Sequence, residues 1–148
     1  MEHQTAYLEG PGLFYVRTRG RSSTGGFRRY FEELLADPRV RPGALILADH
    51  RALEYSLPRT GSSEVKELVD ILKPHVGRVR EVRIVSIVAS TLQFGMTRMW
   101  ESLNEVSEVP LDHFVTQDVD EALAHLGLPP AIMVELEARL DSEAEPMQ

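Results

Sequence analysis

The chain has 148 residues, a formal net charge of −7 and no cysteine, and 43% of its residues are hydrophobic. This length and composition are typical of one soluble globular domain with a substantial core, and the lack of cysteine excludes disulfides, thiolate metal sites and cysteine nucleophiles. No apolar run approaches the roughly 18–20 residues of a membrane-spanning helix, and the start, MEHQTAYLEG, lacks the features of a signal peptide, so we expect a cytoplasmic protein.

The N-terminal third predicts a hairpin and then a helix. Residues 12–18, GLFYVRT, are rich in aromatic and β-branched side chains and indicate a strand. Residues 5–9 indicate a shorter antiparallel strand, joined to it by Gly10-Pro11-Gly12. Thr24 is the expected N-cap of a helix that ends at Asp37-Pro38. Apolar residues of this segment fall on one helical face: Phe27, Tyr30, Phe31, Leu34 and Leu35.

The middle of the chain predicts two buried strands separated by a helix. Residues 44–48, ALILA, show no polar alternation, which indicates burial on both faces, and residues 49–61 are expected to form a loop. A helix should begin near Ser62 or Ser63 and end at Gly77. Its expected buried residues are Val65, Leu68, Val69, Leu72 and Val76. Residues 82–89 then form the third core strand.

The last part of the chain predicts three further helices and a short strand. Ser90 and Gln93 form an S-x-x-Q capping box, and the helix that follows has an apolar stripe of Leu92, Met96, Met99, Trp100, Leu103 and Val106. Residues 111–115 indicate a strand. Asp118 and Glu121 form a capping box for a helix that stops at Gly127. A final helix follows Pro129-Pro130, with Ile132, Leu136 and Leu140 inward, before an acidic tail.

Strands therefore alternate with helices along the chain. This order predicts βαβ units with right-handed crossovers. The N-terminal hairpin adds an antiparallel strand. We expect an α/β fold with a single mixed, mainly parallel sheet of four to five strands and helices packed against it.

The order of segments resembles the STAS superfamily, and more closely its SpoIIAA-like (STAS/SEC14-type) branch of small bacterial proteins. The resemblance rests on FGMTRM at residues 94–99 and on the segment from Phe114 to the helix start at Asp120-Glu121-Ala122. It covers residues 8–127, which leaves 128–148 as a C-terminal helix and acidic tail. It implies a STAS-like fold and a regulatory or protein-interaction role.

The resemblance also suggests a phosphorylation site. In STAS antagonists of anti-sigma factors, a strand ending in Asp leads to a D-S-S-G-like helix start, where a partner kinase phosphorylates one serine. Asp49 matches the strand-end aspartate. Ser62 and Ser63 lie at an expected helix start, but they follow Gly61 and precede Glu64. They are candidate phosphoacceptors, and N-capping is the simpler role for them.

Binding sites in open α/β sheets form beyond the carboxyl ends of the parallel strands. Four expected loops meet there, and helix N-termini and arginines among them suit an anion or an acidic partner segment. We call this expected group the strand-end pole. Its candidate interaction residues are Asp49, His50, Arg51, Ser62, Ser63, Ser90, Thr91 and Arg98.

Known catalytic and cofactor patterns are missing. The chain has no P-loop, no G-x-G-x-x-G, no nucleophile elbow and no histidine pair at i,i+4, so we expect no cofactor, no metal and no enzyme. Asp49 and His50 could join Ser62 or Ser63 in acid–base chemistry, but no spacing supports a triad. Residues 111–148 hold nine acidic residues and one basic residue, and the rest is nearly neutral, so we expect no nucleic-acid partner.

Two functions are consistent with these observations. The leading hypothesis is a non-enzymatic regulatory or protein-interaction module that binds a protein partner or another copy of itself. The alternative is a small-molecule or lipid carrier or sensor of SEC14-like type. In a carrier, Phe94, Met96 and Trp100 would contact an apolar ligand, in a cavity of roughly 300 Å³ or more.

Overall fold

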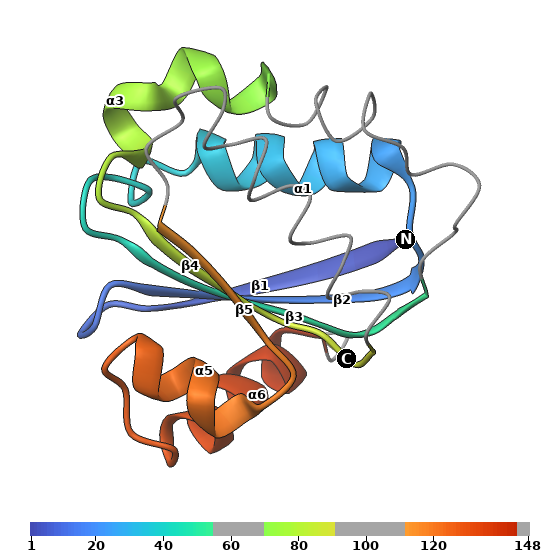
Figure 1. Ribbon diagram of the computed structural model, residues 1–148. Coiled ribbons are helices and arrows are strands. Elements are labelled where there is room, and N and C mark those ends of the chain that lie inside the picture. The colour runs from blue at the N-terminus through green and yellow to red at the C-terminus, as the bar shows by residue number, and fades with distance from the viewer. Residues whose placement is uncertain (55–69, 91–111, 145–148) are drawn as a thin grey trace.

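The structure, a computed structural model, describes residues 1–54, 70–90 and 112–144. Five strands form one mixed sheet in the order β1-β2-β3-β4-β5, with only the β1–β2 pair antiparallel (Figure 1). The strands are β1 Glu2–Leu8, β2 Leu13–Arg21, β3 Leu45–Glu54, β4 Arg83–Ile87 and β5 Asp112–Thr116. The predicted fold class, a mainly parallel sheet with helices packed against it, is confirmed.

Helices cover both faces of this sheet (Figure 1). The described helices are α1 Thr24–Ala36, the 3₁₀ turn η2 Lys73–His75, α3 Val76–Val79, α5 Val119–His125 and α6 Ile132–Ala144. Helices α1 and α3 lie on one face, which we call the α1 face. Helices α5 and α6 lie on the other, the α6 face. The α1 face buries Phe14, Val16 and Ile46, and the α6 face buries Leu47 and Leu123.

Residues 44–48 are buried on both faces apart from Leu45, which is partly buried, much as their sequence predicts. Ile46, Leu47 and Ala48 are each at most 2% exposed. Side chains of a strand alternate between its faces, so an unbroken apolar run is what a central strand between two helical layers requires.

Two helix ends differ from the predicted caps. The N-cap of α1 is Ser23, whose Oγ accepts a hydrogen bond from the Gly26 N–H, so the prediction of Thr24 as the cap is wrong by one residue. Gly77 does not end a helix either. Residues 70–72 are helical, and the chain continues through η2 and α3, with Gly77 inside α3.

Both predicted ends of α5 are confirmed. The Asp118 carboxylate accepts from the N–H groups of Asp120 and Glu121. The second half of the predicted capping box is absent, because the Asp118 N–H donates to Thr116 Oγ1. At the other end Gly127 has a φ of 72°, and the Leu128 N–H donates to the Leu123 carbonyl, which is the Schellman arrangement.

The strands β2 and β3 are longer than predicted, and this correction matters most for the site. β2 runs to Arg21 and β3 to Glu54, whereas the sequence indicated loops after Thr18 and Ala48. Their last residues pair with each other, Arg21 opposite Glu54, beyond the point where Ile87 ends β4. We call this projecting pair, residues 18–21 and 50–54, the ribbon.

The C-terminal helix α6 packs under β1. Leu136 and Leu140 are at most 1% exposed and belong to the core of the α6 face. The boundary between residues 127 and 128 stays a prediction from the resemblance.

Candidate functional site

Asp49 and His50 point to opposite faces of the sheet. Both lie in β3, where consecutive side chains alternate. Asp49 contacts Tyr15, which belongs to the core of the α6 face, whereas His50 contacts rings of α1. Of the residues expected at the strand-end pole, Asp49 and His50 therefore lie in two separate buried clusters, with the β3 backbone between them. The Asp49 and His50 side chains are not hydrogen-bonded to each other in this arrangement.

On the α6 face, Asp49 is held by both of its carboxylate oxygens. Arg51 donates from Nε to Oδ1 at 2.9 Å and from Nη2 to Oδ2 at 2.8 Å. The Arg51 backbone N–H also donates to Oδ1, at 3.1 Å, and the Tyr15 hydroxyl donates to Oδ2, also at 3.1 Å. Asp49 is 4% exposed. Its lone pairs are used inside the protein.

The ionisation of this cluster follows from its contacts. Burial alone would raise the pKa of Asp49, but the hydrogen bonds from the side chain and backbone of Arg51 outweigh it and hold the pKa below its ordinary value. Burial, together with the Asp49 carboxylate, raises the pKa of the Tyr15 hydroxyl. Asp49 is therefore a carboxylate and Tyr15 a neutral donor at neutral pH.

A neighbouring ion pair, between Arg17 and Asp141, connects β2 to α6. Arg17 Nη2 lies 3.2 Å from Asp141 Oδ1 and donates to Gln4 Oε1 at 3.0 Å. Arg17 therefore connects β1, β2 and α6.

On the α1 face, His50 is enclosed by apolar rings. Its Nδ1 lies 2.7 Å from Thr18 Oγ1, and Phe27 and Tyr30 meet the imidazole edge-on. Burial lowers the pKa of His50 to about 4. The imidazole is therefore neutral at physiological pH and closed off from solvent.

The sequence analysis missed a second buried pair on the α1 face. Ser86 Oγ of β4 lies 2.8 Å from His113 Nε2 of β5, and both residues are less than 10% exposed. The available signal was a polar residue at an inward position of each strand, Ser86 among apolar neighbours and His113 before Phe114.

The other predicted site residues fall in two groups. Ser90 is described and lies in a bend after β4, half-buried. Seven of them lie outside the described residues: Ser62, Ser63, Thr91, Phe94, Met96, Arg98 and Trp100. The phosphoacceptor and apolar-ligand hypotheses therefore stay predictions.

No helix in residues 1–54, 70–90 and 112–144 is long and apolar enough to cross a membrane. In the same part of the chain, no group of three or more histidines and carboxylates is placed to hold a metal ion.

Comparisons with known proteins bear on the fold. No protein-family model matches the chain, and no curated protein matches it. Among solved structures, the chain is similar to an uncharacterized protein of the DUF3478 family with a SpoIIAA-like fold from Shewanella loihica. The two share 18% sequence identity with a TM-score of 0.54, over 84% of this chain and 92% of the other. The resemblance read from the sequence is thus confirmed for the fold: this chain has a SpoIIAA-like fold.

Proposed function

We propose that this chain is a non-enzymatic protein-interaction module and that the ribbon is part of its interaction surface. The observation that carries the proposal is the internal pairing at the strand ends. The Asp49 carboxylate is saturated by Arg51 and Tyr15, and His50 is neutral and enclosed. That Asp49 and His50 are engaged inside the fold supports an interaction role over acid–base chemistry at these two residues.

The ribbon supplies exposed groups beside these buried ones. The Arg51 side chain is 40% exposed while it is bound to Asp49, which fixes its guanidinium at the surface. Arg19 is 61% exposed, and its Nε pairs with Glu2 on the neighbouring strand; Arg21 is also exposed. The bidentate face of Arg51 is already occupied by Asp49, so Arg19 and Arg21 are the ribbon arginines that suit contacts with carboxylates of a protein partner.

Capture from a lysate of the native organism, with chemical crosslinking, tests this function. The ribbon variant Arg19→Glu with Arg21→Glu would be compared with a control of equal charge change, Arg29→Glu with Arg41→Glu, whose residues are exposed elsewhere. We expect the wild type and the control to retain the same partner and the ribbon variant to lose it about tenfold or more. Equal capture by both variants, or no protein above bead background, would contradict the proposal.

A further inference from the structure

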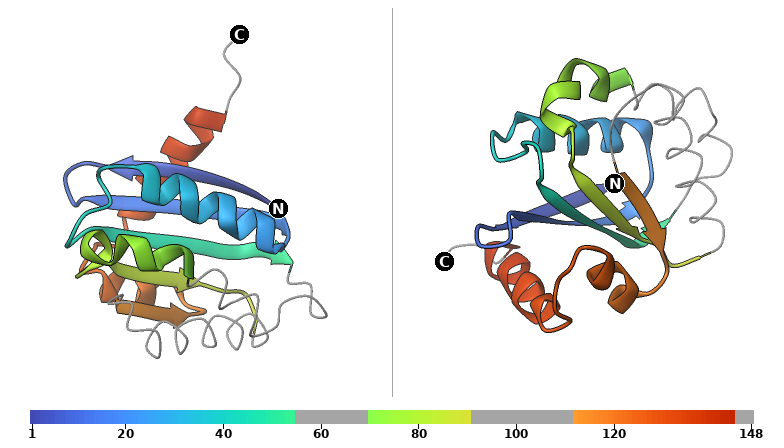
Figure 2. Two further views of the ribbon diagram at one scale, coloured as in Figure 1. Left: turned by 90° about the horizontal axis from the view of Figure 1, so that it is seen from above. Right: turned by 60° about the vertical axis from the view of Figure 1, so that its left-hand side comes forward.

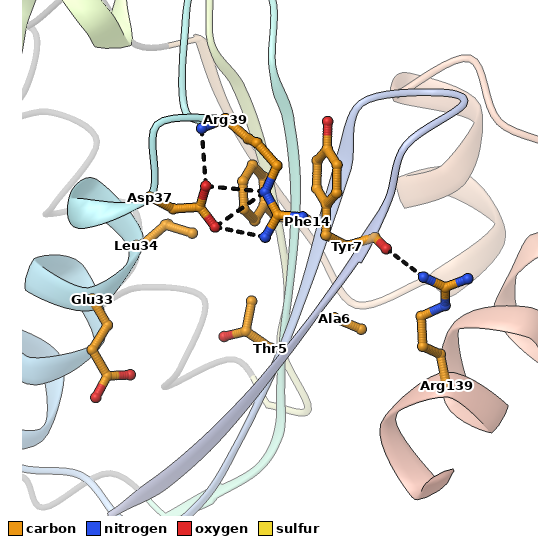
Figure 3. A pocket seen from close by; sticks show the side chains of 9 residues that line it. All are labelled: Thr5, Ala6, Tyr7, Phe14, Glu33, Leu34, Asp37, Arg39 and Arg139. Atoms are coloured by element: carbon orange, nitrogen blue, oxygen red, sulfur yellow. Dashed lines mark hydrogen bonds and ion pairs between the residues drawn. The ribbon is translucent and has the colours of Figure 1, made fainter. Parts of the chain in front are cut away.

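The free edge of β1 carries a groove that the proposed function does not use. β1 is the end strand of the sheet, paired only with β2. A groove of about 350 Å³ lies at its outer side (Figure 3). It is lined from four elements: Thr5, Ala6 and Tyr7 of β1, Phe14 of β2, Glu33 and Leu34 of α1 with Asp37 and Arg39 after it, and Arg139 of α6.

The backbone of β1 presents to this groove N–H and C=O groups that are not paired with β2. The Gly12 carbonyl accepts from Leu45 N–H in β3, so even-numbered residues of β2 face β3 and odd-numbered ones face β1. In the register of the hairpin, the odd residues of β2 pair with the even residues of β1. The N–H and C=O groups of His3, Thr5 and Tyr7 therefore point away from the sheet. Arg139 Nη1 confirms this direction, because it donates to the Tyr7 carbonyl at 2.9 Å.

Helix α6 determines what can pair with this edge. It passes under β1 and continues beyond it (Figure 2). A strand added to the edge would have the end of α6 beneath it, as β1 has. A second copy that paired through its own β1 would place its own α6 on the same face of the sheet under the same edge. The two α6 helices would then compete for the same space. The arrangement therefore favours a single extended segment over a second copy.

The side chains around the groove select the chemistry of that segment. On the α1 side, Tyr7 and Leu34 offer apolar surface. The Arg39 guanidinium lies 4.0 Å from the Tyr7 ring centre, and its charge is neutralised by three hydrogen bonds to the Asp37 carboxylate. On the α6 side, the guanidinium of Arg139 has only the Tyr7 carbonyl as a hydrogen-bond partner within the described part of the chain. An apolar residue fits the first side, and a carboxylate fits the second.

We propose that β1 binds an extended peptide with alternating apolar and acidic side chains, which adds to the sheet as a sixth strand. The peptide N–H replaces Arg139 at the Tyr7 carbonyl, and Arg139 then pairs with a peptide carboxylate. Main-chain bonds supply affinity in such strand addition, and alternate side chains supply specificity. This site is separate from the ribbon, so either proposal can fail without the other.

Amide hydrogen exchange measured by NMR tests the edge first. In the free protein, the amides of His3, Thr5 and Tyr7 should exchange at least about tenfold faster than those of Gln4, Ala6 and Leu8, because only the latter are paired. Uniform protection along β1 that rises with protein concentration would overturn the proposal in favour of a second copy.

A synthetic peptide then tests the site. The probe is the blocked heptapeptide Val-Glu-Val-Glu-Val-Glu-Val, with its Val/Lys counterpart and an alternately N-methylated form as controls. At about 1 mM, the Val/Glu peptide should protect the amides of His3, Thr5 and Tyr7, and both controls should fail. Arg139→Gln should weaken binding of the Val/Glu peptide about tenfold.

Thr5 offers a matched pair of variants. Thr5→Pro removes an outward N–H that no strand uses, and edge strands tolerate such a proline, so this variant should fold. It should not bind the peptide, because the N–H that the peptide needs is gone. Thr5→Val keeps the N–H and should retain peptide binding. Three results would each overturn the proposal. They are no protection of the wild type by the Val/Glu peptide, equal binding of the Val/Lys peptide, and peptide binding retained by a folded Thr5→Pro variant.

Discussion

At the residue scale, the strand-end clusters show how two adjacent polar residues acquire different environments. Asp49 is charged and bound by an arginine, whereas His50, the next residue, is neutral and bound by a threonine. A buried charge is tolerated only when paired, and a buried imidazole stays neutral when it has no counter-charge on its own face. Each residue should therefore affect stability in its own pH range.

Replacing Asp49 should destabilise the fold. Asp49→Asn keeps the shape but removes the charge that holds Arg51 and Tyr15, so we expect a loss of about 2 kcal/mol in the free energy of unfolding, moderated by the partial exposure of Arg51. Asp37→Asn is the matched control, because Asp37 forms the same kind of pair with Arg39 nearer the surface, and should cost less than about 1 kcal/mol. Urea unfolding at pH 7 measures both. Equal losses would contradict the account.

The effect of Asp49 should depend on pH in a fixed direction. Its pKa is lower in the folded state than in the unfolded chain, so the stabilisation is present above the unfolded value of ~3.9 and is lost as pH falls through the folded value. The difference between wild type and Asp49→Asn should therefore shrink only in acid. A difference that is already gone at pH 5 would be inconsistent with a lowered pKa.

His50 should make stability fall in a different pH range. The unfolded chain binds a proton at His50 near pH 6.5, whereas the folded protein resists protonation until about pH 4. His50 therefore does not lower the free energy of unfolding above about pH 6.5, but it lowers this free energy by up to about 3 kcal/mol as the pH falls to 4. His50→Asn should flatten this part of the stability profile. NMR titration should show His50 neutral at pH 6, and a midpoint near 6.5 would refute its burial.

At the element scale, local signals predicted the helices better than the strand ends. Ser23, Asp118 and Gly127 act within a few residues, so the ends that they determine could be predicted to within about one position, whereas the stop predicted at Gly77 was wrong. The ribbon could not be predicted from local signals, because residues 19–21 (RGR) and 50–54 (HRALE) become strands only by pairing with each other. One signal was present: Leu53, at an inward position of that polar run, is 2% exposed.

The alternation of side chains along β3 explains why the site was predicted only in part. Asp49 was correctly placed at the end of the apolar part of β3, but a loop was expected from it onward. In a loop, Asp49 and His50 can converge on one ligand, whereas in a strand they cannot. The partners of both residues, Tyr15 and Thr18, come from β2 and depend on strand register, which no local pattern contains.

Helix α6 should be an integral part of the core. Leu140 is 1% exposed under β1, so Leu140→Ala should cost about 2–5 kcal/mol. Val134→Ala on the same helix is the control, because Val134 is 74% exposed and its loss should be within about 0.5 kcal/mol. Thermal and urea unfolding measure both variants. A Leu140→Ala protein as stable as the control would show that α6 is not docked as described.

At the scale of the whole molecule, the architecture followed from the order of the elements. Alternating strands and helices dictate crossovers, and the Gly10-Pro11-Gly12 turn dictates the antiparallel strand, so the mixed sheet could be predicted without knowledge of any contact. Function could not be predicted in this way, because one fold supports many sites. The two proposed binding surfaces, the ribbon and the β1 edge, exist only when the strands are paired.

The most direct test of the interaction-module account is native mass spectrometry of the freshly purified chain, repeated after denaturation. We expect the polypeptide mass, alone or with a protein partner, and no small molecule that is lost on denaturation. A small apolar compound that co-purifies and is released on denaturation would contradict the account and favour the carrier alternative.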